Sequence, residues 1–320
     1  RSGWQADAPL ALNARLTGVA LDARLAESIP DSLRRMWTRF QPAGIVDADL
    51  QLSHDGRRAW PEVTVQLRNV SFTDAERFPY RLERGTGTLK FLQPPGQETG
   101  ELLLDVLAHG HDQPIKIDAH LTGMKGLPTS STPTANPSTR PPPPLGWIEF
   151  SGREIPLHRQ LIDALPAAGQ RVVHALRPSG KFDFRWRCDR TSAAPARADK
   201  TLEMSLLGCA IVYEKFPYEI RDIRGQFTSR NGAWYFHDLK SQNPNRSTEI
   251  TCRGESVPTS NGRRLELSFT GSDLPLDEQL WQALPPEVQL ARTQLRPRGR
   301  VNFNARVIHD GITGVPTKPW

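Results

Sequence analysis

Three stretches of the chain alternate strictly between apolar and polar residues. Residues 45–52, 181–188 and 300–307 each carry apolar side chains at every second position, with charged or amide side chains between most of them. Alternation with a period of two predicts antiparallel strands with one apolar face and one polar face. The apolar positions are Val46, Ala48, Leu50 and Leu52 in the first stretch, Phe182, Phe184, Trp186 and Cys188 in the second, and Val301, Phe303, Ala305 and Val307 in the third.

A helical segment is expected before each of these strands. Asp22, His158 and Asp277 stand where the N-cap of a helix belongs. Pro30 is expected to open a second short helix, and Pro42 to end it. Such a pair could cover an edge or one end of the sheet. The first copy shows a helical stripe of apolar residues at Leu25, Ile29, Leu33, Trp37 and Phe40.

These elements recur because the chain is a repeat. Two prolines and a following glycine keep the same spacing in all three copies, and a Phe-Pro-Tyr motif occurs at 78–80 and 216–218. Long repeats build arrays in which each unit buries its apolar surface on its neighbours. We expect a first repeat over 1–146, a second over 147–264 and the start of a third over 265–320. Together they would form one array cut from a longer protein.

The proline-rich stretch 127–145 has the composition of a disordered segment. In a protein without repeats it would indicate a linker between domains. Here its counterpart near residues 255–264 joins two adjacent predicted strands. We therefore expect 127–145 to be an expanded loop within a β-hairpin.

Charge and composition exclude little but weigh against nucleic acid as a partner. The net charge is +6 and the isoelectric point is about 9.5. The arginines are spread through every segment rather than gathered in a dense basic run. The three cysteines, Cys188, Cys209 and Cys252, show no metal-ligand spacing, and their odd number argues against a complete disulfide framework. Their redox state does not follow from the sequence.

Several short motifs resemble catalytic or metal sites, but a turn explains each of them. His54-Asp55-Gly56 and His309-Asp310-Gly311 occupy one repeat position, and Asp-Gly after an alternating strand predicts a hairpin turn. The segment 109–112 (HGHD) has too few ligands for a structural zinc site and is expected to be a polar loop. The sequence carries no nucleophile elbow and no phosphate-binding glycine loop. We predict no enzyme, no cofactor, and no catalytic or metal-binding residue.

The chain resembles the AsmA/TamB/YhdP superfamily of bacterial envelope proteins. The resemblance rests on the segments 152–166 and 271–285, which share Gly-x-x-[Ile/Leu]-Pro-Leu-[Asp/His] and Ala-Leu-Pro, and on 213–225 and 234–239. It implies a mostly β fold, namely an elongated, curved antiparallel sheet with a hydrophobic groove and a short helical pair in each repeat. It supplies no set of catalytic residues.

The resemblance also implies a function. Members are implicated in phospholipid transport between the inner and outer membranes, in the periplasm, from an N-terminal transmembrane anchor. We expect phospholipid or another acyl-chain lipid as the ligand and an outer-membrane protein as a further partner. The groove residues would be Val46, Ala48, Leu50, Leu52, Phe182, Phe184, Trp186, Val301, Phe303, Ala305 and Val307.

Two other functions fit the same alternation. A structural or adhesive extracellular β-repeat protein would fill its apolar face as a closed core, as two-layer sandwiches do. A carbohydrate-binding or carbohydrate-active protein would need exposed aromatic rings near carboxylates, for which Trp60 and Trp234 are the candidates. The sequence does not distinguish an open apolar face from a packed one.

Overall fold

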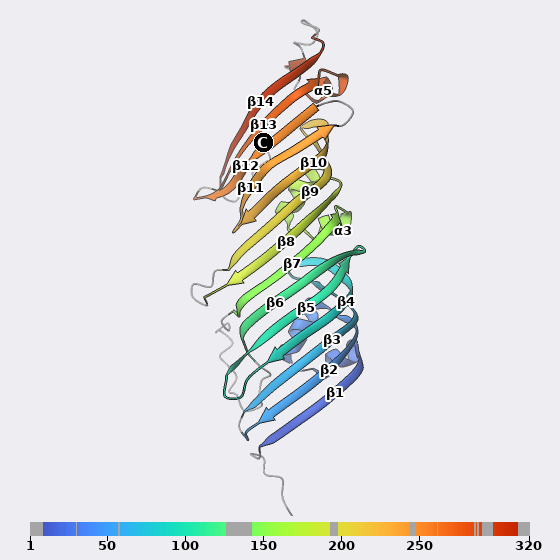
Figure 1. The fold of residues 1–320 in the computed structure, drawn as a ribbon, viewed down its shortest axis with the longest axis vertical. Helices are drawn as coiled ribbons and strands as arrows, with labels where there is room; N and C mark the ends of the chain where they lie inside the picture. Colours follow the sequence, from blue (N-terminus) through green and yellow to red (C-terminus); the bar gives the residue numbers. More distant parts are fainter. Residues whose placement is uncertain are drawn as a thin grey trace, which may run out of the picture. The chain divides into compact units, whose positions relative to one another are not determined.

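The chain forms a single open sheet of 14 antiparallel strands, whose order in the sheet follows their order in the chain (Figure 1). The computed structural model describes residues 9–29, 31–56, 58–125, 143–192, 198–243, 248–260, 262–284, 286, 288–289 and 297–312. The prediction of a mostly β, antiparallel fold is confirmed. The strands are β1 (Leu10–Leu21), β2 (Ala43–His54), β3 (Ala59–Asp74), β4 (Phe78–Leu92), β5 (Thr99–Gly110), β6 (Gln113–Lys125), β7 (Leu145–Pro156), β8 (Lys181–Arg190), β9 (Asp199–Tyr213), β10 (Phe216–Arg230), β11 (Ala233–Asn243), β12 (Thr248–Thr259), β13 (Gly262–Pro275) and β14 (Arg300–Ile312).

Short helices interrupt the strands at regular intervals. One helical segment lies between β1 and β2, the next between β7 and β8, and the last between β13 and β14. Each therefore follows the previous one after six strands, as the sequence repeat predicts. The helices are α1 (Ala23–Ser28), α2 (Asp31–Phe40), α3 (Arg159–Ala164), α4 (Ala167–Leu176) and α5 (Glu278–Ala283).

The chain divides into two compact units. Unit 1 comprises Arg1–Gly152 and Arg187–Asp199, and unit 2 comprises Arg153–Trp186 and Lys200–Trp320. Each unit is described by itself below.

In unit 1 helix α2 packs on strand β3. The guanidinium of Arg39, in the last turn of α2, donates to the carboxylate of Asp74 at the end of β3, with an Nε–Oδ1 distance of 2.9 Å. The backbone N–H of Ala75 donates to the carbonyl of Arg39 at 2.9 Å. These contacts fix α2 at the end of the sheet where β3 turns into β4.

In unit 2 helix α5 packs on strand β10. Tyr218, Leu274, Leu280 and Ala283 are all buried and form one hydrophobic cluster. Phe303 of β14 packs against this cluster, so the helix joins β10, β13 and β14 at one end of their strands. The helical segments thus cover strand ends, which is one of the two placements that the sequence predicts.

The helical segments begin in the same way, which confirms the predicted N-caps. In each copy the side chain of the cap residue accepts a hydrogen bond from the backbone N–H three residues later, which would otherwise lack a partner. The middle copy achieves this with an imidazole nitrogen instead of a carboxylate. The pairs are Asp22 Oδ1 with Leu25 N (3.0 Å), His158 Nδ1 with Leu161 N (3.3 Å) and Asp277 Oδ1 with Leu280 N (2.9 Å).

Helix α2 ends just before Pro42, as predicted. Helix α2 ends one residue before Gln41, which adopts a left-handed conformation (φ 44°) directly before Pro42. Arg177 follows α4 in the same conformation (φ 43°). Pro166 is the N-cap of α4, whereas its counterpart Pro30 lies outside the described residues.

The Phe-Pro-Tyr motif opens β4 and β10, a position where a missing backbone donor interrupts no ladder. Tyr80 and Tyr218 are both buried, with 6% of each residue exposed. Gly87 and Gly225 then take positive φ values (120° and 125°) where the pairing of both strands shifts register. The repeated motif is therefore a packed strand start followed by a bulge.

Two of the three motifs interpreted as turns are turns. Asp55 closes the β2–β3 hairpin by accepting from the backbone N–H of Arg58 at 2.8 Å, and His111 and Asp112 connect β5 to β6 with positive φ values. The prediction for the third copy is wrong. Asp310 and Gly311 continue strand β14 opposite Arg264 and Arg263, because β13 extends far enough to pair with them.

The proline-rich stretch joins two strands that pair with each other. Strand β6 ends at Lys125 and β7 begins at Leu145, and the two are antiparallel neighbours. Residues 126–142 lie outside the described part of the chain, so the expected disorder stays a prediction for 127–142. At the end of the stretch it is wrong, because Leu145 already belongs to β7.

Candidate apolar binding surface

One face of unit 1 consists of rows of apolar side chains that cross seven neighbouring strands. Residues directly opposite each other in an antiparallel pair lie on the same face of the sheet. We call the face carried by these rows the apolar face of unit 1. The rows are Ala14, Leu50, Val63, Phe91, Leu102, Leu121 and Gly146; Leu16, Ala48, Val65, Leu89, Leu104, Ala119 and Ile148; and Val19, Val46, Leu67, Gly87, Val106, Ile117 and Phe150.

Burial increases along this face towards the helical pair. In the row nearest α2, Val46, Val106 and Ile117 are 4–6% exposed. In the row nearest the β2–β3 hairpin, Leu50, Phe91 and Leu102 are only half-buried. The face is therefore packed at the helical end and partly open to solvent at the hairpin end.

Half-burial of this kind indicates a face without a second layer. In a two-layer sandwich the inward side chains of both sheets interdigitate and become fully buried. Within the described residues every strand of unit 1 belongs to the one sheet. Leu12 and Leu16 of β1 are even 45% and 49% exposed. Contiguous apolar surface that remains partly exposed is typical of an interaction site.

Unit 2 carries an equivalent face over β9–β14. A continuous row crosses all six strands, and a second row crosses the last four. We call the face carried by these rows the apolar face of unit 2. The first row is Met204, Phe227, Phe236, Gly254, Leu267 and Val307, and the second is Leu239, Cys252, Phe269 and Ala305.

The structure places the candidate residues of β14 unevenly on this face. Val301 and Phe303 pack against the buried cluster beside α5 and so belong to the packed helical end. Val307 is half-buried, and Ala305 is exposed. Among these four, Val307 and Ala305 therefore offer the more open surface.

The candidates of the other two strands follow the same gradient. In β2, Val46 is buried, whereas Ala48, Leu50 and Leu52 are half-buried. In β8, Phe182 is buried and contacts Phe184 with a ring separation of 6.1 Å, while Phe184 and Trp186 are half-buried. In both strands the candidate residue nearest the helices, Val46 or Phe182, is the most enclosed.

The prediction from the sequence covered only a small part of the two apolar faces. It named residues of β2, β8 and β14, but the rows extend through the intervening strands with equal regularity. Alternation was present there too, as in residues 88–91 and 115–121. Among the residues that the prediction missed, Leu89, Phe91, Ile115 and Ile117 lie in these alternating stretches.

The opposite face of unit 1 is largely polar and carries ion pairs across strands. Arg15 pairs with Asp49 at 2.6 Å, and Lys90 pairs with Glu62 at 2.8 Å. Exposed pairs of this kind contribute about 0–1 kcal/mol each. They keep this face solvated and leave the apolar face as the surface available to an apolar ligand.

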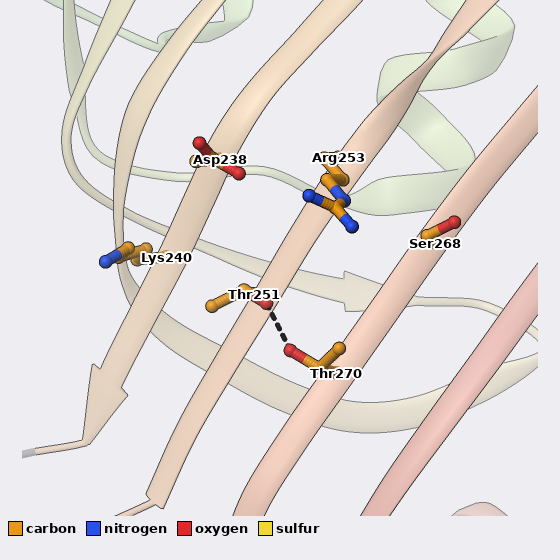
Figure 2. A pocket seen from close by; sticks show the side chains of 6 residues that line it. All are labelled: Asp238, Lys240, Thr251, Arg253, Ser268 and Thr270. Atoms are coloured by element: carbon orange, nitrogen blue, oxygen red, sulfur yellow. Dashed lines mark hydrogen bonds between the residues drawn. The ribbon is translucent and has the colours of Figure 1, made fainter.

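The opposite face of unit 2 is also polar. Figure 2 shows a shallow pocket there, lined by side chains of β11, β12 and β13. Thr251 and Thr270 form a hydrogen bond across β12 and β13, beside the charged side chains of Lys240 and Arg253.

Cys252 lies on the apolar face of unit 2, and its pKa shows how apolar its surroundings are. Its neighbours across the strands are Leu239 and Phe269. Burial raises the pKa of the Cys252 thiol to about 12, because an apolar surrounding disfavours the thiolate. All three cysteines are free thiols.

The two tryptophans that could bind carbohydrate are engaged in packing. The indole N–H of Trp60 donates to the carbonyl of Gln97 at 3.2 Å, and the ring of Trp234 lies 5.8 Å from that of Phe227. Within the part of the chain that the structure describes, no three His, Cys, Asp or Glu residues are grouped as metal ligands.

None of the described helices is long and apolar enough to cross a membrane. Comparisons with family models, with curated proteins and with solved structures find no match to this chain.

Proposed function

We propose that this chain is a segment of a bacterial envelope protein that carries phospholipid, or another acyl-chain lipid, between the inner and outer membranes. It would thereby serve outer-membrane biogenesis, and its role would be transport along a surface rather than catalysis. The observation that carries the proposal is the continuous, half-buried apolar face of unit 1, backed by a solvated polar face.

Such transport needs no reactive group and no specific pocket, but it needs an apolar surface that is continuous over a long distance. Each methylene kept from water is worth about 0.8 kcal/mol, so an acyl chain must remain covered throughout its passage. Rows of Leu, Val, Ile and Phe meet this need without a specific pocket. They also let the ligand move, because contacts at one row resemble those at the next.

The dimensions of the face suit one acyl layer. From Val46 to Leu52 strand β2 rises six residues, which is about 20 Å at 3.3 Å per residue. One leaflet of a bilayer contributes about 15 Å of hydrocarbon. A lipid lying along the strand can therefore bury its chains and leave its polar end at the rim.

The resemblance to the AsmA/TamB/YhdP superfamily supplies the proposed setting. The protein would lie in the periplasm and be held at the inner membrane by a transmembrane anchor outside these 320 residues. An outer-membrane protein would be a further partner. These statements rest on sequence motifs in segments 152–166, 213–225, 234–239 and 271–285.

The competing function is a structural or adhesive β-repeat with a closed core. That function requires the apolar face to be filled, whereas Leu50, Phe91 and Leu102 are half-buried under no second sheet in the described residues. This observation favours an open face that a ligand covers.

Native mass spectrometry of the purified chain, with lipid extraction from the same sample, tests the proposal. Phospholipid retained in near-stoichiometric amount is the expected result. A stable protein that is free of lipid, and that takes up none from added vesicles, would overturn the proposal in favour of the closed-core function.

A further inference from the structure

The strand that follows each helical segment carries a basic or titratable side chain on the apolar side, at or near its far end. His54, Arg190 and His309 each follow the repeated glycine by ten residues. By alternation they share a face with Leu52, Cys188 and Val307, two residues earlier in the same strands. All three are half-buried. Each of these three strands thus carries apolar residues followed by one polar side chain on the same face.

Arg190 has an unmet hydrogen-bonding requirement. Its Nε atom is enclosed and has no hydrogen-bond partner among the described residues. Arg187, on the polar face of the same strand, instead donates to Glu149 and Asp189 at 3.2 and 2.8 Å. An arginine stays charged in a protein, so the enclosed Nε–H of Arg190 requires an acceptor, and an anion suits it best.

His54 uses one of its two ring nitrogens within its own turn. Its Nδ1 accepts from the backbone N–H of Gly56 at 3.0 Å. In a neutral imidazole the proton then resides on Nε2, which remains available as a donor. Across the strands His54 faces Leu10 and Ala59, and His309 faces Leu265, so neither has a carboxylate directly opposite among the described residues.

The packed helical end determines which way a lipid can lie. Val46 and Phe182 are each 6% exposed, and Phe303 packs on the cluster beside α5. A polar head group at that end would be buried without partners, which is unfavourable for an anion above all. In each of these three strands the opposite end, where His54, Arg190 or His309 lies, is the end that can receive it.

We propose that His54, Arg190 and His309 form repeated binding positions for the phosphate group of a phospholipid whose acyl chains lie on the apolar face. The inference rests on the proposed function and adds to it the head-group chemistry and the orientation of the lipid. Each position supplies N–H donors to anionic oxygens, and the guanidinium of Arg190 adds a permanent positive charge.

The test compares two probes that share their acyl chains, dioleoyl phosphatidylglycerol and dioleoylglycerol. Native mass spectrometry measures the retention of each by the whole chain and by the variants Arg190→Gln, Arg190→Lys and Arg185→Gln. Arg185 is the matched control, because it lies on the polar face of the same strand. Circular dichroism checks that each variant remains folded.

We expect Arg190→Gln to lower retention of the phosphatidylglycerol about fivefold to tenfold, which corresponds to the loss of one charge-assisted hydrogen-bonding group. Retention of dioleoylglycerol should not change, and Arg190→Lys and Arg185→Gln should behave like the wild type. Should Arg190→Gln not fold, the double variant His54→Gln/His309→Gln gives an independent reading, with an expected loss of about twofold to fivefold that is selective for the phosphatidylglycerol.

Three results separate the possible failures. Retention of neither probe by the wild type would overturn the proposed function itself. An equal effect of Arg190→Gln on both probes, or none on either, would overturn the phosphate positions while leaving transport intact. Binding of inorganic phosphate alone, lost in Arg190→Gln, without a preference for the phospholipid would show a site for free anions instead.

Discussion

The aromatic ring of Phe303 lies directly over the backbone of Gly271 on the neighbouring strand. The two residues are opposite each other in β14 and β13, and a β-carbon on Gly271 would overlap the ring. Gly271 has no positive φ, so its small size, and not its conformational freedom, fits it to this position. The same ring packs on the cluster beside α5 and seals the helical end of unit 2.

Gly271→Ala should therefore destabilise unit 2. The added methyl group must displace the Phe303 ring from a packed cluster, and overpacking of this kind costs about 1–3 kcal/mol. Chemical denaturation measures the change in the free energy of unfolding. Gly169→Ala in α4 is the control, because a β-carbon there meets only ordinary contacts, so it should be neutral or stabilising. Equal effects of the two substitutions would contradict this account of Gly271.

His158→Asp should stabilise the chain. An aspartate already caps the equivalent helix at Asp22 and Asp277, with shorter hydrogen bonds than the 3.3 Å bond made by His158. A better N-cap is worth about 0.5–1 kcal/mol. The midpoint of thermal unfolding should rise, and Asp277→Ala should lower it by a similar free energy. A decrease on His158→Asp would show that the imidazole makes contacts that outweigh the cap.

The ion pair between Arg39 and Asp74 should make the attachment of α2 sensitive to acid. The hydrogen bond from Arg39 lowers the pKa of Asp74 below its usual value. A carboxyl whose pKa is depressed in the folded state stabilises that state above its unfolded pKa of about 3.9. This stabilisation is lost as the pH falls through the folded pKa. Unfolding free energies from pH 7 to pH 2 should show a shallower acid decline for Asp74→Asn; identical slopes would argue against the pair.

The Cys252 thiol should react slowly with alkylating agents until the pH is strongly alkaline. Only the thiolate reacts, and a pKa of about 12 leaves very little of it at pH 8. Mass spectrometry of timed iodoacetamide reactions measures the rate at each pH. Bound lipid would slow the reaction further, since Cys252 lies on the apolar face of unit 2. Rapid modification at pH 8 in the folded, lipid-free protein would contradict the burial of this thiol.

Leu50→Glu should abolish lipid retention while leaving the chain folded. A carboxylate in the half-buried row can reach solvent, so the expected loss of stability is under about 2 kcal/mol. Acyl chains, however, would have to cross a charge. The control is Gln51→Glu, which places the same charge on the polar face one residue away. Unfolding of Leu50→Glu, or undiminished retention of lipid, would each count against an open, lipid-bearing face.

The local structure of each repeat was readable from the sequence. Alternation identified the strands, and the recurring proline and cap positions predicted the helical segments, including the cap at His158. These features depend on interactions between residues close in the chain, which a single sequence records directly.

The pairing between strands could not be predicted in the same way. The register shifts at bulges beside Gly87 and Gly225, and each extra residue there changes which side chains lie opposite each other. The strand that continues through Asp310 was missed because the length of β13 decides it. The same alternation of apolar and polar residues occurs whether the apolar face is open or filled. The decrease in burial from Val46 to Leu50 could therefore be found only in the structure.

Site-specific photocrosslinking in cells that make the full-length protein tests the central claim most directly. A benzophenone amino acid replaces Leu50 or Val307 on the apolar faces, and Gln51 or Arg306 on the polar faces, and lipids are labelled with radioactive phosphate. We predict labelled lipid adducts at Leu50 and Val307 and none at the two polar positions. No adduct at any of the four positions, or equal adducts at all of them, would contradict a lipid-carrying apolar face.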